Sequence, residues 1–307
     1  YDLYDNGMPK GTPCGIRGFD EYLRFQGGQV TTITASPGSG KSEFLDFVIT
    51  GLAIRHHWRF GVFSFENQPT ELHDAKLAEK IIGKSFAFRK DASNRIQKRA
   101  LEVVADEIFD KFKVIETSKV DKTVDGILSK AEELVNKYGI KGLLIDPYNK
   151  LTHVFQAGTT ETNYINLVMT KITDFAKKFN IHVFLVVHPT KPQMTNGEAP
   201  KKVSLYNASG SANFYNQTDN GFTLLRNRDT GIVEVFIEKV RFSEQGKEGW
   251  VSFTFDTMTR QYAFHDSKDP ITNESEYETH RSALDYSNRK DIDGDGYITT
   301  DGFVEPF

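Results

Sequence analysis

Residues 35–42 read Ala35-Ser36-Pro37-Gly38-Ser39-Gly40-Lys41-Ser42. An apolar, β-branched run precedes this stretch at 30–34, and an amphipathic pattern follows it at 43–49. A strand, a glycine-bearing turn, Lys-Ser and a helix, in that order, predict a loop that binds phosphate. The unpaired N–H groups at a helix start favour an anion, and glycines let the backbone curl around it. We expect Ser36, Pro37, Gly38, Ser39, Gly40, Lys41 and Ser42 to bind a nucleotide, with Lys41 on its β- and γ-phosphates and Ser42 on Mg²⁺.

Composition limits the class of protein. The 307 residues, of which 38% are hydrophobic, suffice for one large α/β core or a core with an appendage. A net charge of −4 excludes a bulk polycation, so any nucleic-acid contact must come from a local patch or an assembled ring. The single cysteine, Cys14, excludes an internal disulfide framework.

Targeting signals are missing from the sequence. It has no run long enough to span a bilayer and no signal-peptide pattern. We therefore expect a soluble, cytosolic protein. The abrupt start at Tyr1 suggests a fragment of a longer protein.

Apolar strands alternate with amphipathic helices along most of the chain. Strands are expected at 30–34, 59–66, 112–115, 139–146, 181–188, 221–225, 232–240 and 250–255. Helices are expected at 18–23, from 43 onward, and at 69–82, 92–110, 122–138 and 162–179. This alternation predicts an α/β fold with a mostly parallel sheet covered by helices on both faces. In such sheets the ligand lies at the carboxyl ends of the strands.

Three polar residues, Glu66, Asp146 and His188, each end an apolar strand. Asp146 is expected to hold Mg²⁺ or its waters, and Glu66 to activate the water that attacks the γ-phosphate. His188 is expected to sense the γ-phosphate by a hydrogen bond. The alternatives are a solvated strand cap, a surface glutamate and a histidine satisfied at a loop edge.

Lys239 and Arg241 end the strand expected at 232–240. Alternate strand residues share a face, so the two side chains point the same way. Such a cation pair is suited to enter a neighbouring subunit's site and stabilise transition-state charge. The alternative is a solvated basic edge that discourages strand pairing.

Together these residues resemble the hexameric replicative DNA helicases with a RecA-like core. The resemblance is closest to the Twinkle and phage primase–helicase branch, with the bacterial DnaB type next, and covers about 15–262. Three of its motifs surround the nucleotide: that of the catalytic glutamate at 63–67, Walker B at 144–146 and the γ-phosphate sensor at 187–189. The DNA-proximal fourth motif corresponds to 208–212, followed by Gln217, Asp219 and Asn220. The segment that carries the trans-acting lysine and arginine finger corresponds to 238–242.

The resemblance implies a ring of six or seven subunits with NTP sites between them. It also implies an NTP-driven motor that moves on single-stranded DNA and unwinds duplex during replication, with polymerase or primase as possible partners. The family's DNA-holding loops correspond to a region that offers Lys191, Lys201, Lys202, Asn207 and Asn213. Lysines there would bind phosphates without reading sequence, unless the region is a solvated loop with incidental lysines.

Two further family features concern the ends of the motor region. An aromatic from the final strands stacks on the nucleotide base in the family. Phe242 and Phe255 are the candidates here, although we favour core packing for either. The family's amino-terminal domain and an obvious linker helix before Gly15 are absent, which weakens the expectation of ring assembly by this sequence.

Two rival functions remain at this point. A RecA- or KaiC-like recombination or regulatory ATPase shares the first three motifs but not the strand-borne Lys-x-Arg pair. An NTP-gated binding module is the other rival, although the presence of both Glu66 and Asp146 argues against it.

The chain divides into an amino-terminal arm at 1–14, the motor at 15–262 and a polar, acidic tail at 263–307. Within the tail, 291–299 copies the first nine positions of an EF-hand calcium loop, but Gly302 stands where the bidentate glutamate belongs. We favour a disordered acidic tail over weak Ca²⁺ binding at Asp291, Asp293 and Asp295.

Overall fold

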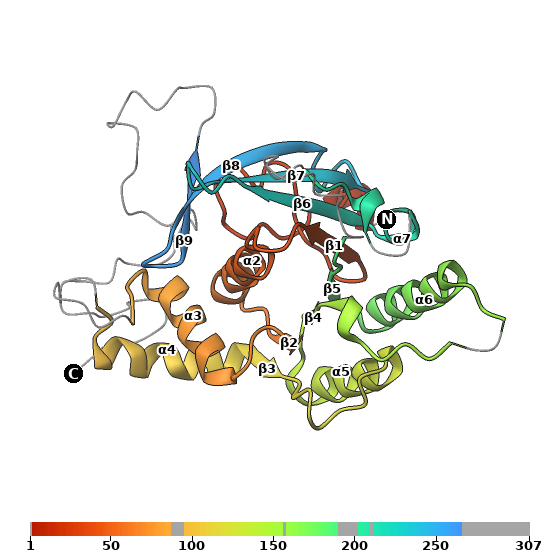
Figure 1. Cartoon of the computed structure of the whole chain (residues 1–307), viewed down its shortest axis with the longest axis horizontal. Coiled ribbons are helices and arrows are strands. Elements are labelled where there is room, and N and C mark those ends of the chain that lie inside the picture. The colour runs from red at the N-terminus through yellow and green to blue at the C-terminus, as the bar shows by residue number, and fades with distance from the viewer. Residues whose placement is uncertain (1, 87–94, 156–157, 190–201, 209–211, 266–307) are drawn as a thin grey trace.

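A single sheet organises the molecule. The computed structural model describes residues 2–86, 95–155, 158–189, 202–208 and 212–265. Within these ranges, nine strands form one sheet in the order β3-β2-β4-β5-β1-β6-β7-β8-β9 (Figure 1). The strands are β1 Val30–Ala35, β2 Phe60–Ser64, β3 Phe112–Val114, β4 Gly142–Asp146, β5 His182–Val186, β6 Asn220–Arg226, β7 Ile232–Val240, β8 Gly249–Asp256 and β9 Gln261–His265.

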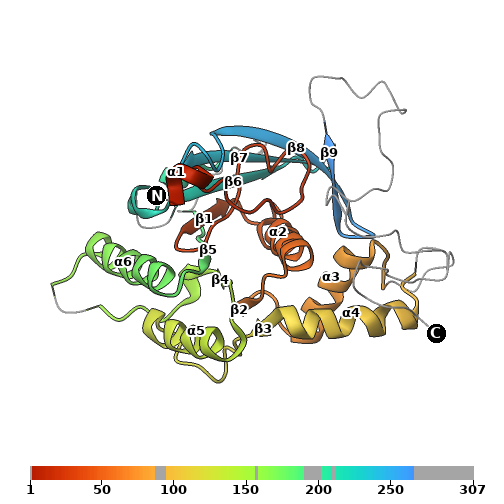
Figure 2. The same ribbon diagram turned by 180° about the vertical axis from the view of Figure 1, so that it is seen from behind.

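Helices cover both faces of the sheet (Figures 1 and 2). One buried cluster joins the sheet to α2, α3 and α4, and a second joins it to α5 and α6. The helices are α1 Asp2–Asn6, α2 Lys41–His56, α3 Thr70–Ile82, α4 Lys98–Lys111, α5 Val124–Tyr138, α6 Glu161–Phe179 and α7 Asn213–Gln217, with short 3₁₀ turns η2 Tyr148–Lys150 and η3 Leu205–Asn207. The expectation of a two-faced α/β layer structure is confirmed.

Strand direction defines two edges of the sheet. Strands β1 to β6 pair in parallel, so β1, β2, β4 and β5 all end at one edge, which we call the phosphate edge. Strand β7 runs back antiparallel to β6, and its last residue, Val240, pairs with Asn220 at the start of β6. The end of β7 therefore lies at the other edge, where β1 begins, which we call the opposite edge.

Two local features differ from the prediction. The segment 18–23 forms turns rather than a helix, because Asp20 accepts hydrogen bonds from the backbone N–H groups of Cys14 and Gly15 and so ties the chain back on itself. The sheet also contains β9, Gln261–His265, which was not among the expected strands.

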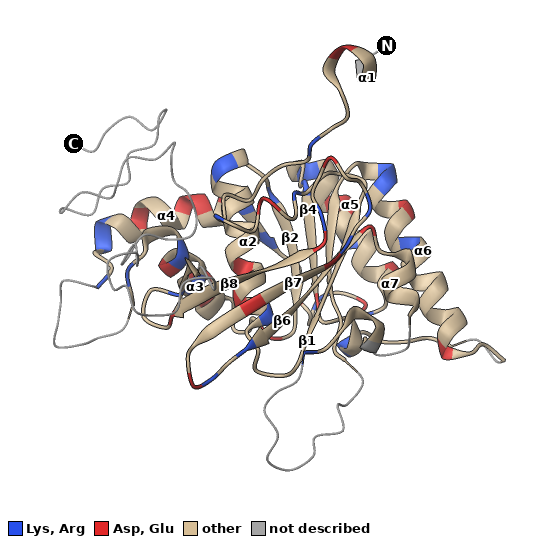
Figure 3. Cartoon of the chain, turned by 90° about the horizontal axis from the view of Figure 1, so that it is seen from above, with Lys and Arg blue, Asp and Glu red and all other residues tan. Residues whose placement is uncertain are grey.

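The amino-terminal segment is partly structured. It holds α1, which projects from the body of the molecule (Figure 3). Thr12 bridges to Phe25, and Cys14 is fully buried with a free thiol, so residues 12–14 belong to the core domain rather than to an arm. No helix within the described ranges has the length and apolarity that crossing a membrane requires.

Candidate nucleotide site

The predicted phosphate loop connects β1 to α2 as expected. Gly38 and Gly40 both adopt left-handed φ values, of 76° and 84°, which favour glycine. A Cβ on Gly38 would lie 3.0 Å from a guanidinium nitrogen of Arg228, so the Arg228 side chain also leaves little room for a larger residue at this position. Gly40 is the N-cap of α2 and brings no side chain to the helix start. The first backbone N–H groups of α2 therefore remain available for an anion.

Four predicted site residues meet at the phosphate edge. The Ser42 hydroxyl donates to Asp146 Oδ2 at 2.8 Å and lies 3.3 Å from Glu66 Oε2. The other oxygen of Glu66, Oε1, lies 3.6 Å from His188 Nε2. Residues from α2, β4 and the ends of β2 and β5 are thus brought into one cluster, as expected from their positions at strand ends.

Asp146 is a candidate metal ligand on its geometry. It is fully buried, and its Oδ1 has no hydrogen-bond partner among the described residues. Burial raises the pKa of this carboxyl to about 6, against the hydrogen bond from Ser42. A buried carboxylate with an unused oxygen, next to a hydroxyl, fits a hard cation such as Mg²⁺.

No cluster of three or more His, Cys, Asp or Glu side chains in the described part of the chain is placed to hold a metal ion by itself. A cation at Asp146 and Ser42 must therefore complete its coordination with water and with the oxygens of a bound nucleotide, as Mg²⁺ commonly does.

The pKa values of Glu66 and Lys41 are both lowered, but for different reasons. The adjacent His188 side chain, opposed by burial and helped by the Lys41 charge, lowers the pKa of Glu66 to about 2. Glu66 is therefore a carboxylate at neutral pH. Burial lowers the pKa of Lys41, which is only 7% exposed, while Glu66 and Asp146 oppose that shift. The two carboxylates keep a buried ammonium beside the phosphate loop.

The backbone around Asp146 fixes its neighbours. The carbonyl of Asp146 accepts the N–H of Phe65 at 2.9 Å, next to Glu66. The side chain of Asn149, in η2, accepts the N–H of His188 at 2.6 Å. The end of β4 and the turn that follows it therefore hold the chain just after β2 and just after β5 in place.

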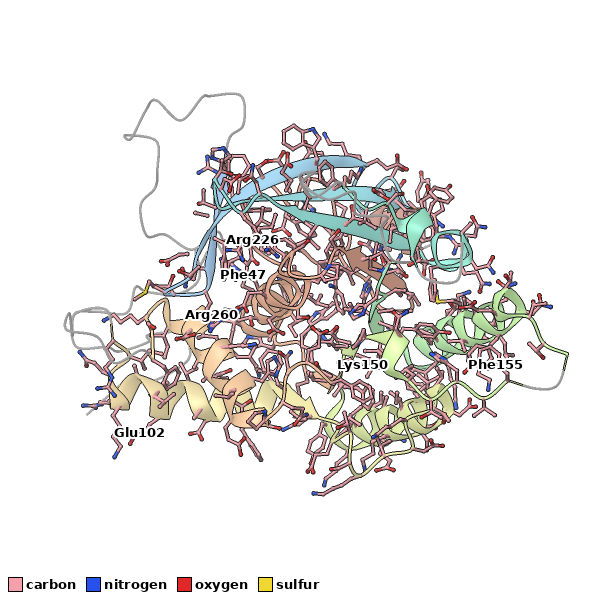
Figure 4. All side chains as sticks on the ribbon, viewed as in Figure 1. Phe47, Glu102, Lys150, Phe155, Arg226 and Arg260 are labelled. Atoms are coloured by element: carbon pink, nitrogen blue, oxygen red, sulfur yellow. The ribbon has the colours of Figure 1, made fainter. Side chains whose placement is uncertain are left out.

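The wall beside the phosphate loop was not predicted. Arg226 ends β6 and lies 5.7 Å from the ring centre of Phe255, which packs on Tyr262 at 4.7 Å between ring centres. Figure 4 labels Arg226 where the antiparallel strands pass over α2. The Tyr262 hydroxyl approaches the loop, since a Cβ on Gly40 would lie 3.5 Å from it. The signal available in the sequence was that Arg226 follows the strand expected at 221–225.

The two candidate base-stacking aromatics lie at different edges. Phe255 is on β8 beside Tyr262, near the phosphate loop. Phe242 follows β7 beside Arg241, so it lies at the opposite edge. Phe242 is therefore not placed to stack on a base at its own phosphate loop, because β7 runs away from that loop.

Lys239 and Arg241 also lie at the opposite edge, away from their own phosphate loop. Lys239 Nζ donates to the carbonyls of Tyr215 at 2.7 Å and Asn216 at 3.1 Å. Arg241 Nη1 donates to Asp219 Oδ1 at 2.7 Å. Both cations lie at this end of β7, but the chain does not bring them to Glu66 or Asp146.

Two of the residues predicted to contact DNA, Lys202 and Asn213, bind other residues of this chain. Lys202 pairs with Glu238 at 3.0 Å, and the Asn213 amide donates to the carbonyl of Thr162 at 3.1 Å. Lys191, Lys201 and the side chain of Asn207 lie outside the described residues, as do Asp291, Asp293 and Asp295. Their predicted roles stay predictions.

Comparisons with known proteins agree with this arrangement. The family model of the DnaB-like helicase C-terminal domain matches residues 11–263. Twinkle homolog protein, chloroplastic/mitochondrial, of Arabidopsis thaliana is 35% identical over 278 residues, which is 87% of this chain and 38% of that protein. The chain therefore spans less than half the length of that relative.

Two solved structures share the fold. The ATPase domain of G40P gives a TM-score of 0.69 at 18% identity and covers 86% of this chain and 94% of its own. A DnaB-like replicative helicase, studied with its primase interactions, gives 0.66 at 18% identity and covers 86% and 64%. The RecA-like fold expected from the sequence is confirmed.

Proposed function

Because this chain belongs to the DnaB-like helicase family, we propose that it is the motor of a replicative DNA helicase. It hydrolyses NTP, moves along single-stranded DNA and unwinds duplex. The observation that supports this proposal is the cluster of Ser42, Glu66, Asp146 and His188 beside Lys41. These are the groups that phosphoryl transfer to water requires.

In the proposed mechanism, Lys41 and the start of α2 hold the β- and γ-phosphates. Ser42 and Asp146 would hold Mg²⁺, which would supply positive charge to neutralise the phosphate oxygens. Glu66 orients a water whose oxygen bonds to the γ-phosphorus as the bond to the β,γ-bridging oxygen breaks. The water's proton passes to Glu66.

His188 gives this mechanism a dependence on the nucleotide. While His188 lies beside Glu66, the pKa of that carboxyl is about 2, and so weak a base accepts a proton poorly. When His188 turns to a γ-phosphate oxygen instead, the pKa of Glu66 rises towards its ordinary value. Glu66 then becomes a stronger base only when the γ-phosphate is present.

Lys239 and Arg241 complete the site of a neighbouring subunit. Within one chain they lie at the opposite edge, so they reach a phosphate loop only across a subunit contact. We propose a ring of six or seven subunits with sites at the interfaces. The region predicted to bind DNA, which includes Lys202 and Asn213, lines its channel, and primase or polymerase are candidate partners.

The working compartment follows from the same proposal. The name of the Arabidopsis relative assigns that protein to chloroplasts and mitochondria. We propose either the cytoplasm of a bacterium or phage-infected cell, or an organelle matrix, for this chain.

The test is NTP hydrolysis with and without single-stranded DNA over a series of protein concentrations. We expect DNA stimulation that increases with protein concentration, because the sites are completed between subunits. Glu66→Gln should lower kcat by at least about a hundredfold, since general-base catalysis contributes ~10²–10⁴-fold. Glu71→Gln, in the exposed first turn of α3, is the matched control and should leave kcat unchanged.

Hydrolysis indifferent to DNA and to protein concentration would remove the helicase assignment and leave only a phosphate-binding site. Strand exchange on filaments without unwinding would favour the recombinase-like alternative. Nucleotide binding with no turnover would favour the binding module.

A further inference from the structure

We propose that Asp219 is a positioning residue that ties the phosphate-loop strand of its own subunit to the arginine presented to the neighbouring subunit. The inference rests on the proposed role of Arg241 and adds a partner that sets its geometry. Asp219 lies between α7 and β6, at the opposite edge of the sheet from the nucleotide site.

The carboxylate of Asp219 is shared between two elements. Its Oδ2 accepts the backbone N–H of Val30, the first residue of β1, at 2.9 Å. Its Oδ1 accepts from Arg241 Nη1 at 2.7 Å. The Asp219 side chain is only 4% exposed, whereas that of Arg241 is 53% exposed. A buried carboxylate therefore anchors one corner of a guanidinium that otherwise faces outward.

The segment that carries Asp219 is fastened to the start of β1. The Thr218 hydroxyl accepts the N–H of Thr32 at 3.1 Å and lies 2.9 Å from the carbonyl of Val30. The N–H of Asp219 donates to that same carbonyl at 3.0 Å. Asp219 is therefore held by β1 through both its backbone and its side chain.

Arg241 is held by the same segment at two points. Its backbone N–H lies 3.4 Å from the Asn220 side-chain oxygen, and its guanidinium lies on Asp219. An arginine side chain that is half exposed has many rotamers, and binding in one of them has an entropic cost. A fixed, desolvated carboxylate selects the rotamer in advance and leaves the other guanidinium N–H groups for a phosphate.

This arrangement connects two nucleotide sites through one strand. The end of strand β1 leads into the phosphate loop of its own subunit. The start of β1 is hydrogen-bonded to Asp219, which in turn binds Arg241, the arginine that serves the next subunit. A shift of β1 when its loop fills or empties is thereby transmitted to Arg241. The nucleotide state of one site then changes the transition-state stabilisation at the adjacent one.

Asp219→Asn tests the proposal, because an amide oxygen still accepts from Val30 while its NH₂ group no longer pairs with Arg241. We expect kcat for DNA-stimulated NTP hydrolysis to fall about ten- to hundredfold, since small misplacements of a catalytic group cost up to ~10²-fold. KM for NTP should change less than about twofold, because the variant's own phosphate loop is intact. Asp110→Asn is the matched control. It breaks another Arg–Asp pair, with Arg59 at 3.0 Å beside β3, and should leave kcat unchanged.

A double-mutant cycle separates positioning from a general structural role. Arg241→Ala alone should lower kcat about a thousandfold or more, as removal of an arginine finger does. Adding Asp219→Asn to Arg241→Ala should cause no further loss, since the residue to be positioned is gone. A further loss of similar size in the double variant would overturn the inference, while the proposed role of Arg241 would stand. Near-normal hydrolysis by Arg241→Ala would overturn both.

If Asp219→Asn does not fold, as judged by circular dichroism, Arg241→Lys gives the same test from the exposed side of the pair. It keeps the charge, but one ammonium cannot both hold Asp219 and reach a phosphate in the geometry of a guanidinium. We expect activity near that of Arg241→Ala. Recovery of half or more of the wild-type kcat would overturn the inference.

Discussion

The phosphate edge and the opposite edge of the sheet both hold charged side chains, but with different partners. At the phosphate edge, Asp146 is buried with an oxygen that has no partner among the described residues. At the opposite edge, the cations Lys239 and Arg241 are bound to carbonyls and to Asp219 of their own chain. The first edge is arranged to receive a ligand, and the second is already ordered before any neighbour arrives. In the proposed ring, a single subunit therefore carries halves of two different sites.

The largest expected effect is complementation between inactive variants. Lys41→Ala and Arg241→Ala should each abolish hydrolysis, yet rings assembled from both should recover part of it. An interface between an intact phosphate loop and an intact Arg241 is then complete. The measurement is NTP turnover of co-assembled variants against each variant alone.

The control for complementation combines Lys41→Ala with Glu66→Gln. Both residues belong to the phosphate edge of one subunit, so every site lacks one of them and activity should not return. If Lys41→Ala with Arg241→Ala behaves like this control, the assignment of the two edges to different sites is wrong.

A second prediction contrasts the carboxylates of the two edges. Asp146→Asn should lower kcat by about a hundredfold, as loss of a metal-site group does. Without metal or nucleotide it should instead stabilise the protein at neutral pH, because it removes a buried charge. Asp219→Asn should destabilise the protein, because it leaves Arg241 without its partner.

The pH dependence of this contrast has a definite sign. The pKa of Asp146 is raised from 3.8 to about 6, so the folded state holds its proton more tightly than the unfolded state. The stability from that proton is complete below about pH 4 and is lost as the pH rises through about 6, by ~3 kcal/mol at most. Thermal unfolding without metal should show the Asp146→Asn advantage growing between pH 4 and 7. A constant difference across that range would contradict the assignment.

The smallest expected effect concerns the two aromatics. Phe255→Leu keeps an apolar side chain but removes a ring face, and KM for NTP should rise about tenfold, since stacking of a base contributes ~1–3 kcal/mol. Phe242→Leu, at the opposite edge, is the matched control and should leave KM unchanged in dilute protein. Equal changes in KM for both variants would show that neither edge alone determines base binding.

The sequence predicted the phosphate edge better than the rest of the molecule, for a physical reason. Lys41 and Ser42 lie within one local strand–turn–helix, and Glu66, Asp146 and His188 each follow an apolar run that marks a strand end. Parallel pairing then brings all of them to one edge without further information. The convergence at Ser42 is therefore largely a consequence of strand direction.

Contacts that depend on antiparallel register were not predictable in this way. Tyr262 lies on β9, a strand that the apolar pattern did not reveal. Arg226 lies over Phe255, the partner of Tyr262, only because β6 to β9 fold over α2. The pairing of Asp219 with Val30 joins residues 189 positions apart. The turns at 18–23 were mistaken for a helix because the contacts of Asp20 with Cys14 and Gly15 are not visible as a periodic pattern.

The reversal of β7 has a consequence for assembly symmetry. Because this strand returns the chain to the start of β1, Lys239 and Arg241 lie at the other edge of the sheet from the phosphate loop. In the proposed ring, each subunit therefore donates its cation pair to one neighbour and accepts a pair at its own nucleotide site. Subunits stacked head to tail in an open series always leave one donor unused at one end and one acceptor incomplete at the other. Only a closed rotational arrangement fills every acceptor, so closure itself adds a working site beyond those of the open chain.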